Sequence, residues 1–450
     1  MVVPSTPVRG VGHWPNGWGA RLAAGFLPPR LPPISRRAFR FQLAFTLFYA
    51  AFEGIMANAP LMAVKAMNAT DVQLELPLAM AAIGLFGSVL LGTAMATRPK
   101  KPFVVIPGFA GAISALLMAW MRSPGWFLAF AGVISIFDFA MRPAVPSIVR
   151  IVYPERCRSH VSGTMRQWSS IVFLCATLLS AALMSVAGKH DRVSLTIHLV
   201  ITFAGLASVA AFYCFWKLPD YGDGSEAEAV PFMEPERSFG RANLAPFLDR
   251  RFRRYLVAFF VFGFANLFHQ GVVPAFFARD MGLGYVQATL LIHIIPNLTA
   301  FFAGGHLTAW FERTSIWRSY ALVTFLWGLD PFILAVASFS LAAVIVGRMA
   351  RGPATLGSMV ISFFTGVHSF ARPGADTSRY MAASLLTNGI SRLVAPTVAA
   401  FALSYLSRRS IILWGGIGIL VSSALFWWND KWDLREAERA IGKSRPEGVT

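Results

Sequence analysis

Two opposite charges stand inside an apolar run of helix length. Asp138 and Arg142 are four residues apart in the segment WFLAFAGVISIFDFAMRPAVPSIVRIVY, which begins at Trp126. Residues at this spacing share one face of an α-helix, so the carboxylate and the guanidinium can pair there. The pair can either neutralise itself within the helix or bind a charged solute. The sequence leaves both roles open.

Glu53 and Arg392 also interrupt apolar runs. Glu53 has no charged neighbour on its own helical turn, and an isolated carboxyl group of this kind favours a proton-carrying or ligand-binding role. Arg392 is expected either to bind an anion or to pair with a carboxylate, since a guanidinium suits both. Ionisable residues at membrane depth usually face a bundle interior or a watery cavity, and they mark functional sites.

Two further groups have helical spacing. One group, Asn266, His269 and Gln270, has the spacing of residues on one face of a helix. A second group, Arg348 and Arg351, has the same kind of spacing on another helix. We expect His269 to line a cavity rather than to pack in a core. At an offset of 210 residues, Asp138 corresponds to Arg348. We therefore weigh a second arrangement, in which these two charges pair across the cavity in the substrate-free state, against the local Asp138–Arg142 pair.

Three polar residues beside prolines are expected to be structural. His293 and Asn297 flank Pro296, where they can satisfy carbonyls that the proline leaves without a donor. Asp330 precedes Pro331 in a run that we place on the outside of a bundle.

The elements that position these residues are membrane spans. Hydrophobic residues make up 56% of the 450 residues and charged residues 14%, and the mean hydropathy is +0.56. A soluble chain of this length would have too little polar surface. The net charge of +18 does not indicate nucleic-acid binding, because Lys and Arg lie mainly in short loops and tails between apolar runs.

The apolar runs predict an all-α polytopic membrane protein with twelve transmembrane helices in two six-helix pseudo-repeats. A run of about 20 apolar residues crosses a hydrocarbon core of about 30 Å. The predicted organisation is a disordered basic tail (1–38), a first six-helix bundle (39–216), a linker (217–250), a second six-helix bundle (251–428) and a charged tail (429–450). The spans are predicted near 39–62, 74–97, 103–121, 126–152, 168–187, 193–216, 254–278, 284–310, 317–337, 339–367, 381–406 and 411–428.

The distribution of basic residues predicts the orientation. Loops on the side of the N-terminus hold ten Lys and Arg and the opposite loops hold seven, and the tails and the linker add more to the first side. The positive-inside rule then places both termini in the cytoplasm, with the protein in the plasma (inner) membrane. Arg408 and Arg409, in an opposite-side loop, do not fit this pattern.

The two halves repeat each other. Pro60, Met67, Val72 and Gln73 recur 214 residues later, as Pro274, Met281, Val286 and Gln287, and Pro143–Ala144 recurs as Pro353–Ala354. Repeats of six spans related by an axis along the membrane normal place a substrate site at the midplane between the halves.

Six plus six spans with a long linker resemble the major facilitator superfamily over about residues 39–428. Three local segments add to the resemblance: GTAMATRPKK from Gly92, YPERCRSHVSG from Tyr153 and GRMARGPATLG from Gly347. The first departs from the family pattern, with Ala96 in place of its Asp and Pro99 in place of its second Gly. The resemblance implies that spans one, four, seven and ten line the cavity, and these are the spans that carry Glu53, the Asp138–Arg142 pair, the Asn266 group and the Arg348 group.

Enzymatic activity is not expected. HEXXH, GXSXG and GXXXXGK[ST] motifs are absent from the sequence, and no cluster has metal-ligand spacing. We expect no cofactor and no metal, and Cys157, Cys175 and Cys214 are expected to be free thiols.

The sequence predicts a secondary transporter that moves a small organic solute by alternating access. Its expected partners are that solute and the lipid bilayer, with protons as one option for coupling. Four candidate arginines outnumber the carboxylates Glu53 and Asp138, which favours an anionic or carboxylate-bearing solute. The alternatives are efflux of drug-like or neutral solutes such as sugars, and a transporter-like sensor that does not transport.

Overall fold

The computed structural model describes residues 31, 33–95, 98–142, 144–153, 155–190, 192–219, 245–311, 313–360, 367–370 and 377–443. Within these ranges the regular elements are all helices. The first half contains α2 (Pro33–Met56), α3 (Ala59–Met67), α4 (Asp71–Met95), α5 (Pro102–Met118), α6 (Pro124–Met141), α7 (Ala144–Val152), α8 (Glu155–Lys189) and α9 (Val193–Trp216). The second half contains α10 (Ala245–Leu248), α11 (Arg250–Gln270), α12 (Val273–Ala275), the π-helix η2 (Phe276–Asp280), α13 (Tyr285–Thr289), the π-helix η3 (Leu290–Ile294), α14 (Ile295–Phe311), α15 (Ile316–Ala337), α16 (Leu341–Val360), α17 (Val367–Phe370), α18 (Thr377–Ala402) and α19 (Arg408–Lys443).

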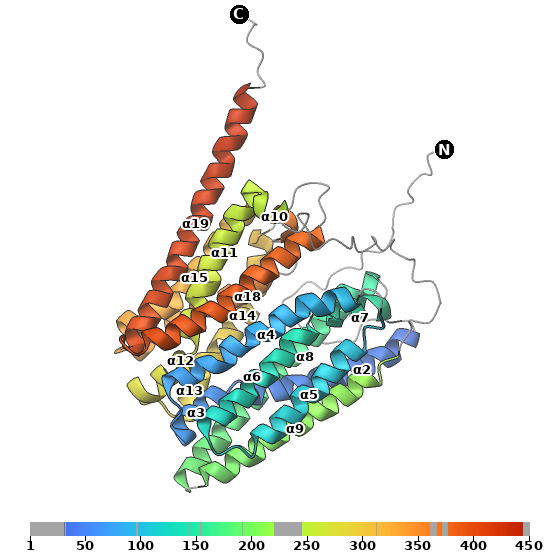
Figure 1. The fold of residues 1–450 in the computed structure, drawn as a ribbon, viewed down its shortest axis with the longest axis vertical. Helices are drawn as coiled ribbons and strands as arrows, with labels where there is room; N and C mark the ends of the chain where they lie inside the picture. Colours follow the sequence, from blue (N-terminus) through green and yellow to red (C-terminus); the bar gives the residue numbers. More distant parts are fainter. Residues whose placement is uncertain are drawn as a thin grey trace, which may run out of the picture.

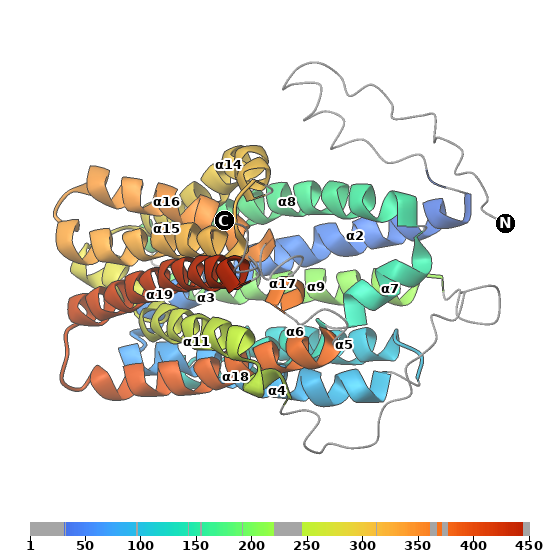
Figure 2. The same ribbon diagram turned by 90° about the horizontal axis from the view of Figure 1, so that it is seen from above.

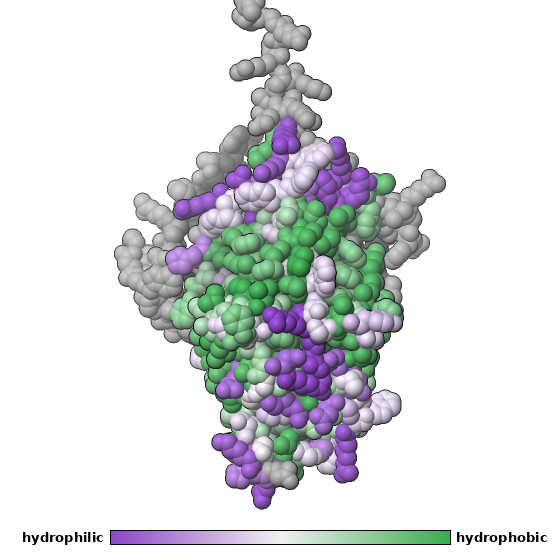
Figure 3. Space-filling view, turned by 90° about the vertical axis from the view of Figure 1, so that its left-hand side faces the viewer, coloured by the Kyte–Doolittle hydropathy of each residue, from purple (hydrophilic) through white to green (hydrophobic). Residues whose placement is uncertain are grey.

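The helices have the length and polarity of membrane spans. Nine segments of the described chain are long and apolar enough to cross a bilayer, and they coincide with nine of the predicted spans. The other three predicted spans correspond to α4, to α16 and to the shorter apolar helix α5. Figure 3 shows a broad hydrophobic band between hydrophilic ends of the molecule. The predicted all-α membrane fold is therefore confirmed, and a count of twelve spans is consistent with it.

Three predicted boundaries differ from the structure. Helix α2 begins at Pro33, inside the predicted 1–38 tail, because Ser35 donates a hydrogen bond to the Val152 carbonyl (3.3 Å) and Ala38 is buried. Helix α10 lies within the predicted linker, and α19 continues into the predicted C-terminal tail. The rest of the predicted N-terminal tail, most of the linker and residues 444–450 lie outside the described residues.

The sequence repeat corresponds to a break in the first long helix of each half. The chain leaves the helix between α2 and α3, and again between α11 and α12. Pro60 and Pro274 then occupy the first turn of the piece that follows. A proline is tolerated there because the first N–H groups of a helix have no partner within it.

Gln73 and Gln287 repeat a second structural feature, the cap of the next helix. The backbone N–H of Thr70 donates to Gln73 Oε1 (2.9 Å), and that of Gly284 donates to Gln287 Oε1 (3.0 Å). In both halves the glutamine therefore satisfies a backbone donor that the helix start leaves unpaired.

The halves are joined at one end of the bundle. Figure 1 shows α3, α12 and α13 together at the lower left, where the two groups of helices meet. Viewed from above, α18 lies beside α4 (Figure 2), and α13 and η3 of the second half contact α8. We call the end that contains α3 and α13 the outer end, and the end where α2 begins the inner end.

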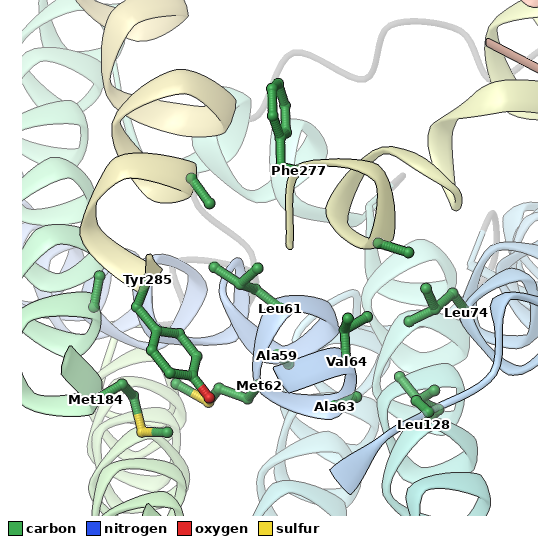
Figure 4. Packing of buried hydrophobic residues seen from close by; sticks show 14 of the residues in the cluster. Ala59, Leu61, Met62, Ala63, Val64, Leu74, Leu128, Met184, Phe277 and Tyr285 are labelled. Atoms are coloured by element: carbon green, nitrogen blue, oxygen red, sulfur yellow. The ribbon is translucent and has the colours of Figure 1, made fainter. Parts of the chain in front are cut away.

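A single hydrophobic cluster crosses between the halves at the outer end. It includes Leu61, Met62 and Val64 of α3 together with Phe277 and Tyr285 of the second half (Figure 4). The other three clusters each contain residues of one half only. The apolar core that both halves share is thus at the outer end, and burial of apolar side chains there favours a closed outer end.

Ion pairs reinforce this closure. Asp71 of α4 pairs with Arg279 of η2 (3.0 Å) and with Arg408 of α19 (2.7 Å), and Arg408 also pairs with Asp280 (2.8 Å). Lys65 donates to the Leu283 carbonyl (2.6 Å). We call Asp71, Arg279, Asp280 and Arg408 the outer ion network. The presence of Arg408 on the side with fewer basic residues is explained by these carboxylate partners.

We expect Arg408→Gln to favour opening of the outer end, because it removes the ion pair with Asp71 that joins the two halves there. Exposed ion pairs contribute up to about 1 kcal/mol each, and a loss of about 1 kcal/mol changes a conformational ratio about fivefold. The measurement is the distance between two spin labels, one on Trp120→Cys and one on Phe339→Cys, with the three native cysteines replaced by serine. Opening of the outer end should increase the population of long distances between the two labels.

Arg409→Gln is the matched control, since Arg409 donates only to the Ala335 and Val336 carbonyls of its own half. The distance distribution of this variant should match that of the parent. Equal distributions in both variants would show that the outer ion network does not hold the closed state.

Candidate functional site

Asp138 and Arg142 form the centre of the site. Arg142 donates from Nε (3.0 Å) and Nη2 (2.6 Å) to Asp138 Oδ2, and Tyr49 of α2 donates its hydroxyl to Asp138 Oδ1 (2.6 Å). Helix α6 places the two charges one turn apart near its end. Of the two arrangements considered from the sequence, the local pair is the one formed.

The alternative pair between Asp138 and Arg348 is not formed in this structure. Arg348 lies against Asp330 of α15, with Nη1 3.2 Å from Oδ2, and both side chains are 2% exposed. The repeat places Asp138 and Arg348 at corresponding positions in the two halves, but each has a carboxylate or guanidinium partner within its own half.

Arg392 brings a second cation to the site from the other half. Its guanidinium lies over the Phe139 ring (4.5 Å to the centroid), and the Arg142 guanidinium also lies over that ring (4.0 Å). Arg392 has no ion pair among the described residues, and its buried Nε has no hydrogen-bond partner there. Of the two roles predicted for Arg392, pairing with a carboxylate is therefore not the one formed here.

Glu53 is the fourth charged residue of the site, after Asp138, Arg142 and Arg392. It lies one turn after Tyr49 on α2, its side chain is exposed, and it has no ion pair among the described residues. The charges that act on it most strongly are those of Asp138, Arg142 and Arg166. The structure thus brings Glu53, Asp138, Arg142 and Arg392 together from the three predicted spans that contain them, which correspond to α2, α6 and α18.

Arg348 and Arg351 belong to a different cluster. Arg351 Nη1 is 2.9 Å from Asp330 Oδ2, so one buried carboxylate serves both arginines. Arg348 also lies over the Phe277 ring (4.9 Å) and Arg351 over the Trp327 ring (5.1 Å). These contacts are typical of a fixed charge cluster inside the second half, and they agree with the structural role expected for Asp330.

The polar face predicted for α11 is divided among three environments. Asn266 accepts a hydrogen bond from Trp327 Nε1 (2.8 Å), and Gln270 is exposed. His269 is 1% exposed, is hydrogen-bonded to the Ala265 carbonyl (2.9 Å) and packs against Gly415 of α19. The expectation that His269 lines the cavity is therefore wrong, because its ring fills the space that Gly415 leaves.

Both His293 and Asn297 were expected to satisfy carbonyls beside Pro296. Asn297 does so, whereas His293 contacts a different part of the chain. Asn297 donates to the His293 carbonyl (2.8 Å), one turn back on its own helix, as expected beside Pro296. His293 Nε2 instead lies 3.1 Å from the Ala57 carbonyl of the first half. Nearby, Thr289 donates to Asn58 Oδ1 (2.8 Å), so this region adds polar contacts to the closed outer end.

Glu75 is a candidate that the sequence interpretation missed. Its side chain is 2% exposed, and neither carboxyl oxygen has a hydrogen-bond partner among the described residues. It faces Gly271 at the end of α11, where a Cβ atom would lie 2.4 Å from Glu75 Oε1. Glu75 is the second residue of the predicted span 74–97, and its burial between the halves depends on contacts with α11 that the span pattern does not show.

The described part of the chain holds no group of three or more His, Cys, Asp or Glu side chains placed to bind a metal ion. The charged and hydroxyl side chains of the site can form ion pairs and hydrogen bonds, and its carboxylates can bind protons.

We predict that Asp330→Asn destabilises the protein strongly, because it leaves Arg348 and Arg351 buried without a counter-charge. Removing one partner of a buried ion pair costs about 3–5 kcal/mol. Thermal unfolding of the purified protein in detergent should show this loss. Adding Arg348→Met to Asp330→Asn should restore part of the stability. A single variant as stable as the parent would show that Asp330 does not neutralise the cluster.

Comparison with known proteins gives the family. The sequence model described as Major Facilitator Superfamily matches residues 41–396. A mutant of the nucleoside transporter NupG has a TM-score of 0.68 at 14% identity, covering 87% of this chain and 99% of its own. A structure described under proton dependent oligopeptide transporters has a TM-score of 0.67 at 16% identity, covering 89% of this chain and 100% of its own.

A bacterial homologue of the human lysosomal transporter Spinster, solved in an inward-facing and unoccupied conformation, has a TM-score of 0.62 at 14% identity and covers 90% of this chain and 98% of its own. The comparison with curated proteins gave no match. At these identities the solved structures show a shared fold, and the family model covers most of the chain. The chain is therefore an integral membrane protein that belongs to the major facilitator superfamily.

Proposed function

We propose that the protein is a secondary active transporter of a small organic anion, a carboxylate-bearing metabolite, and that it works by alternating access with proton coupling. We further propose that it resides in the plasma (inner) membrane with both termini in the cytoplasm. The observation that carries the substrate class is Arg392, a cation without a carboxylate partner among the described residues, stacked on Phe139 beside the Asp138–Arg142 pair.

An anionic group suits this position for two reasons. A planar guanidinium can bind a carboxylate through two parallel hydrogen bonds, and the guanidinium of Arg392 lies over the Phe139 ring (4.5 Å to the centroid). The other nearby cation, Arg142, is held by Asp138 and is 52% exposed. A solute carboxylate could therefore contact Arg392 directly and Arg142 at its exposed side.

Glu53 would link binding to a proton. With Glu53 and Asp138 ionised, their two negative charges balance Arg142 and Arg392. When Glu53 binds a proton, the site gains a net positive charge, which favours an anionic solute. Proton and anion would then bind together, and departure of the anion would favour release of the proton. One structural neighbour is itself described as proton dependent, so the fold accommodates such coupling.

The closed outer end supports alternating access. The halves share a hydrophobic cluster and the outer ion network at that end, and both can separate without unfolding either half. In the described conformation the solute would enter or leave through the inner end. Opening of the outer end would expose Glu53 and Arg392 to the opposite side.

We expect Arg392→Gln to weaken transport of carboxylate solutes selectively. Hydrogen bonds to a charged group contribute about 1.5–3 kcal/mol, which is roughly a tenfold to hundredfold change in affinity. The measurement is uptake into liposomes across a panel of labelled carboxylates, each paired with its neutral amide. Arg409→Gln is the control. If the acid and the amide of each pair are affected equally, Arg392 does not recognise the anion.

We expect Glu53→Gln to abolish accumulation driven by a pH gradient while leaving exchange of solute across the membrane intact, because glutamine retains the shape of the side chain but cannot carry a proton. Glu75→Gln is the comparison variant, since Glu75 is the second glutamate without an ion pair in the described spans. Retained pH-driven accumulation in Glu53→Gln, with loss in Glu75→Gln, would place the proton site at Glu75 instead.

A further inference from the structure

An open groove lies on the outside of the second half, away from the site described above. It is formed by α15 and α19 with the end of α14 and has a volume of about 1110 Å³. Its lining combines aromatic and basic side chains, including Trp310, Phe325, Trp427, Trp428, Lys431 and Arg435. Trp428 is 67% exposed, so the groove opens outward rather than into the bundle.

The groove lies at the inner boundary of the membrane. Lys431 is 23 residues after Arg408, the first residue of α19, which corresponds to about 35 Å along the helix. A hydrocarbon core is about 30 Å thick, so Lys431 reaches the depth of the lipid headgroups. Tryptophan rings are enriched at this depth because they combine an apolar body with an N–H donor.

Two carboxylates of α19 that are close in sequence to Lys431 and Arg435 are paired with other residues. Asp430 is held by Arg318 (2.7 Å) and by Ser315 (2.5 Å). Asp433 accepts from Arg251 (3.0 Å) and from Trp317 Nε1 (2.6 Å). These carboxylates are therefore already occupied.

Lys431 and Arg435 are exposed and have no ion pair among the described residues. They are four residues apart on α19, so both charges face the same side of the helix.

The geometry points to a binding site for an anionic phospholipid. An acyl chain would lie on the apolar floor formed by Phe325, Leu420 and Trp427, and the phosphate would contact Lys431 and Arg435. Basic side chains between helices at the cytoplasmic boundary bind anionic headgroups in this way. The combination of an apolar floor with a cationic rim fits an amphiphile better than free phosphate, which would leave the floor uncovered.

The test compares lipids by thermal unfolding of the full chain in detergent. A ligand that binds the folded state raises the unfolding temperature in proportion to the logarithm of its concentration above its dissociation constant. We expect phosphatidylglycerol to raise it more than phosphatidylcholine does. Lys431→Gln with Arg435→Gln should remove this difference, whereas Arg435→Lys, which keeps the charge, should retain most of it.

Lys217→Gln is the matched control. Lys217 also follows a span at the inner end and lies over an exposed tryptophan, Trp216 (4.9 Å), but it lies outside the groove. This variant should respond to phosphatidylglycerol as the parent does. An equal loss in Lys217→Gln and in the double variant would show general attraction to anionic lipid rather than a site.

Brominated phosphatidylglycerol gives a second readout that does not depend on stability. Bromine on the acyl chain quenches nearby indoles, so Trp427 and Trp428 should produce a saturable decrease in fluorescence in the parent. In the Lys431→Gln, Arg435→Gln double variant, we expect half-maximal quenching to need a lipid concentration at least tenfold higher. An unshifted titration, or an increase in unfolding temperature with inorganic phosphate alone equal to that with lipid, would overturn the lipid site.

Discussion

A charge inside a membrane must have a partner or reach water, and this constraint separates the fixed parts of the molecule from the working parts. Arg348 and Arg351 share Asp330, and at 2% exposure neither Arg348 nor Asp330 can exchange its partner for water. The Asp138–Arg142 pair is satisfied but partly exposed. Arg392, Glu53 and Glu75 lack an ion pair among the described residues. Glu53 is exposed and can reach water, whereas Glu75 and the Nε of Arg392 are buried without a partner among the described residues. A solute, a proton or a conformational change can supply the partner that these residues lack.

The same constraint explains why the outer end can act as a gate. Asp71 and Arg408 are partly exposed, so water can replace their partners when the halves separate, at a cost of about 1 kcal/mol per pair. The hydrophobic cluster around α3 also stabilises the closed end, because burial contributes about 25 cal/mol per Å² of apolar surface removed from water. Glu75 lies within this interface with no hydrogen-bond partner in the described chain, so closing the outer end buries a carboxyl group. Closure is therefore easier when Glu75 is neutral, which makes it the natural rival of Glu53 as proton site.

The sequence predicted those features that depend on local pattern. Span positions follow from hydrophobic runs, and the Asp138–Arg142 pair follows from helical spacing. The repeat of Pro60 and Gln73 indicated two related halves, and the structure adds that these residues belong to broken helices and their caps. It could not predict partners that are distant in sequence. Asp71 and Arg408 are 337 residues apart, and Asp330 was not recognised as the counter-charge of Arg348. The direction of His269 also depends on the absence of a side chain at Gly415, which helical spacing on α11 cannot reveal.

The lipid groove and the gate lie on different parts of the second half, and this separation determines what a bound lipid can do. The walls of the groove are α14, α15 and α19, and its rim is fixed by the Arg318–Asp430 pair within that half. The Asp71–Arg408 pair joins the two halves, whereas the Arg318–Asp430 pair lies within the second half. If the second half moves as one unit, a lipid in the groove has the same affinity for both conformations, and such a ligand cannot shift their ratio. Its effect should be on the stability of the α15–α19 pair, which also carries Asp330, and not on the direction of transport.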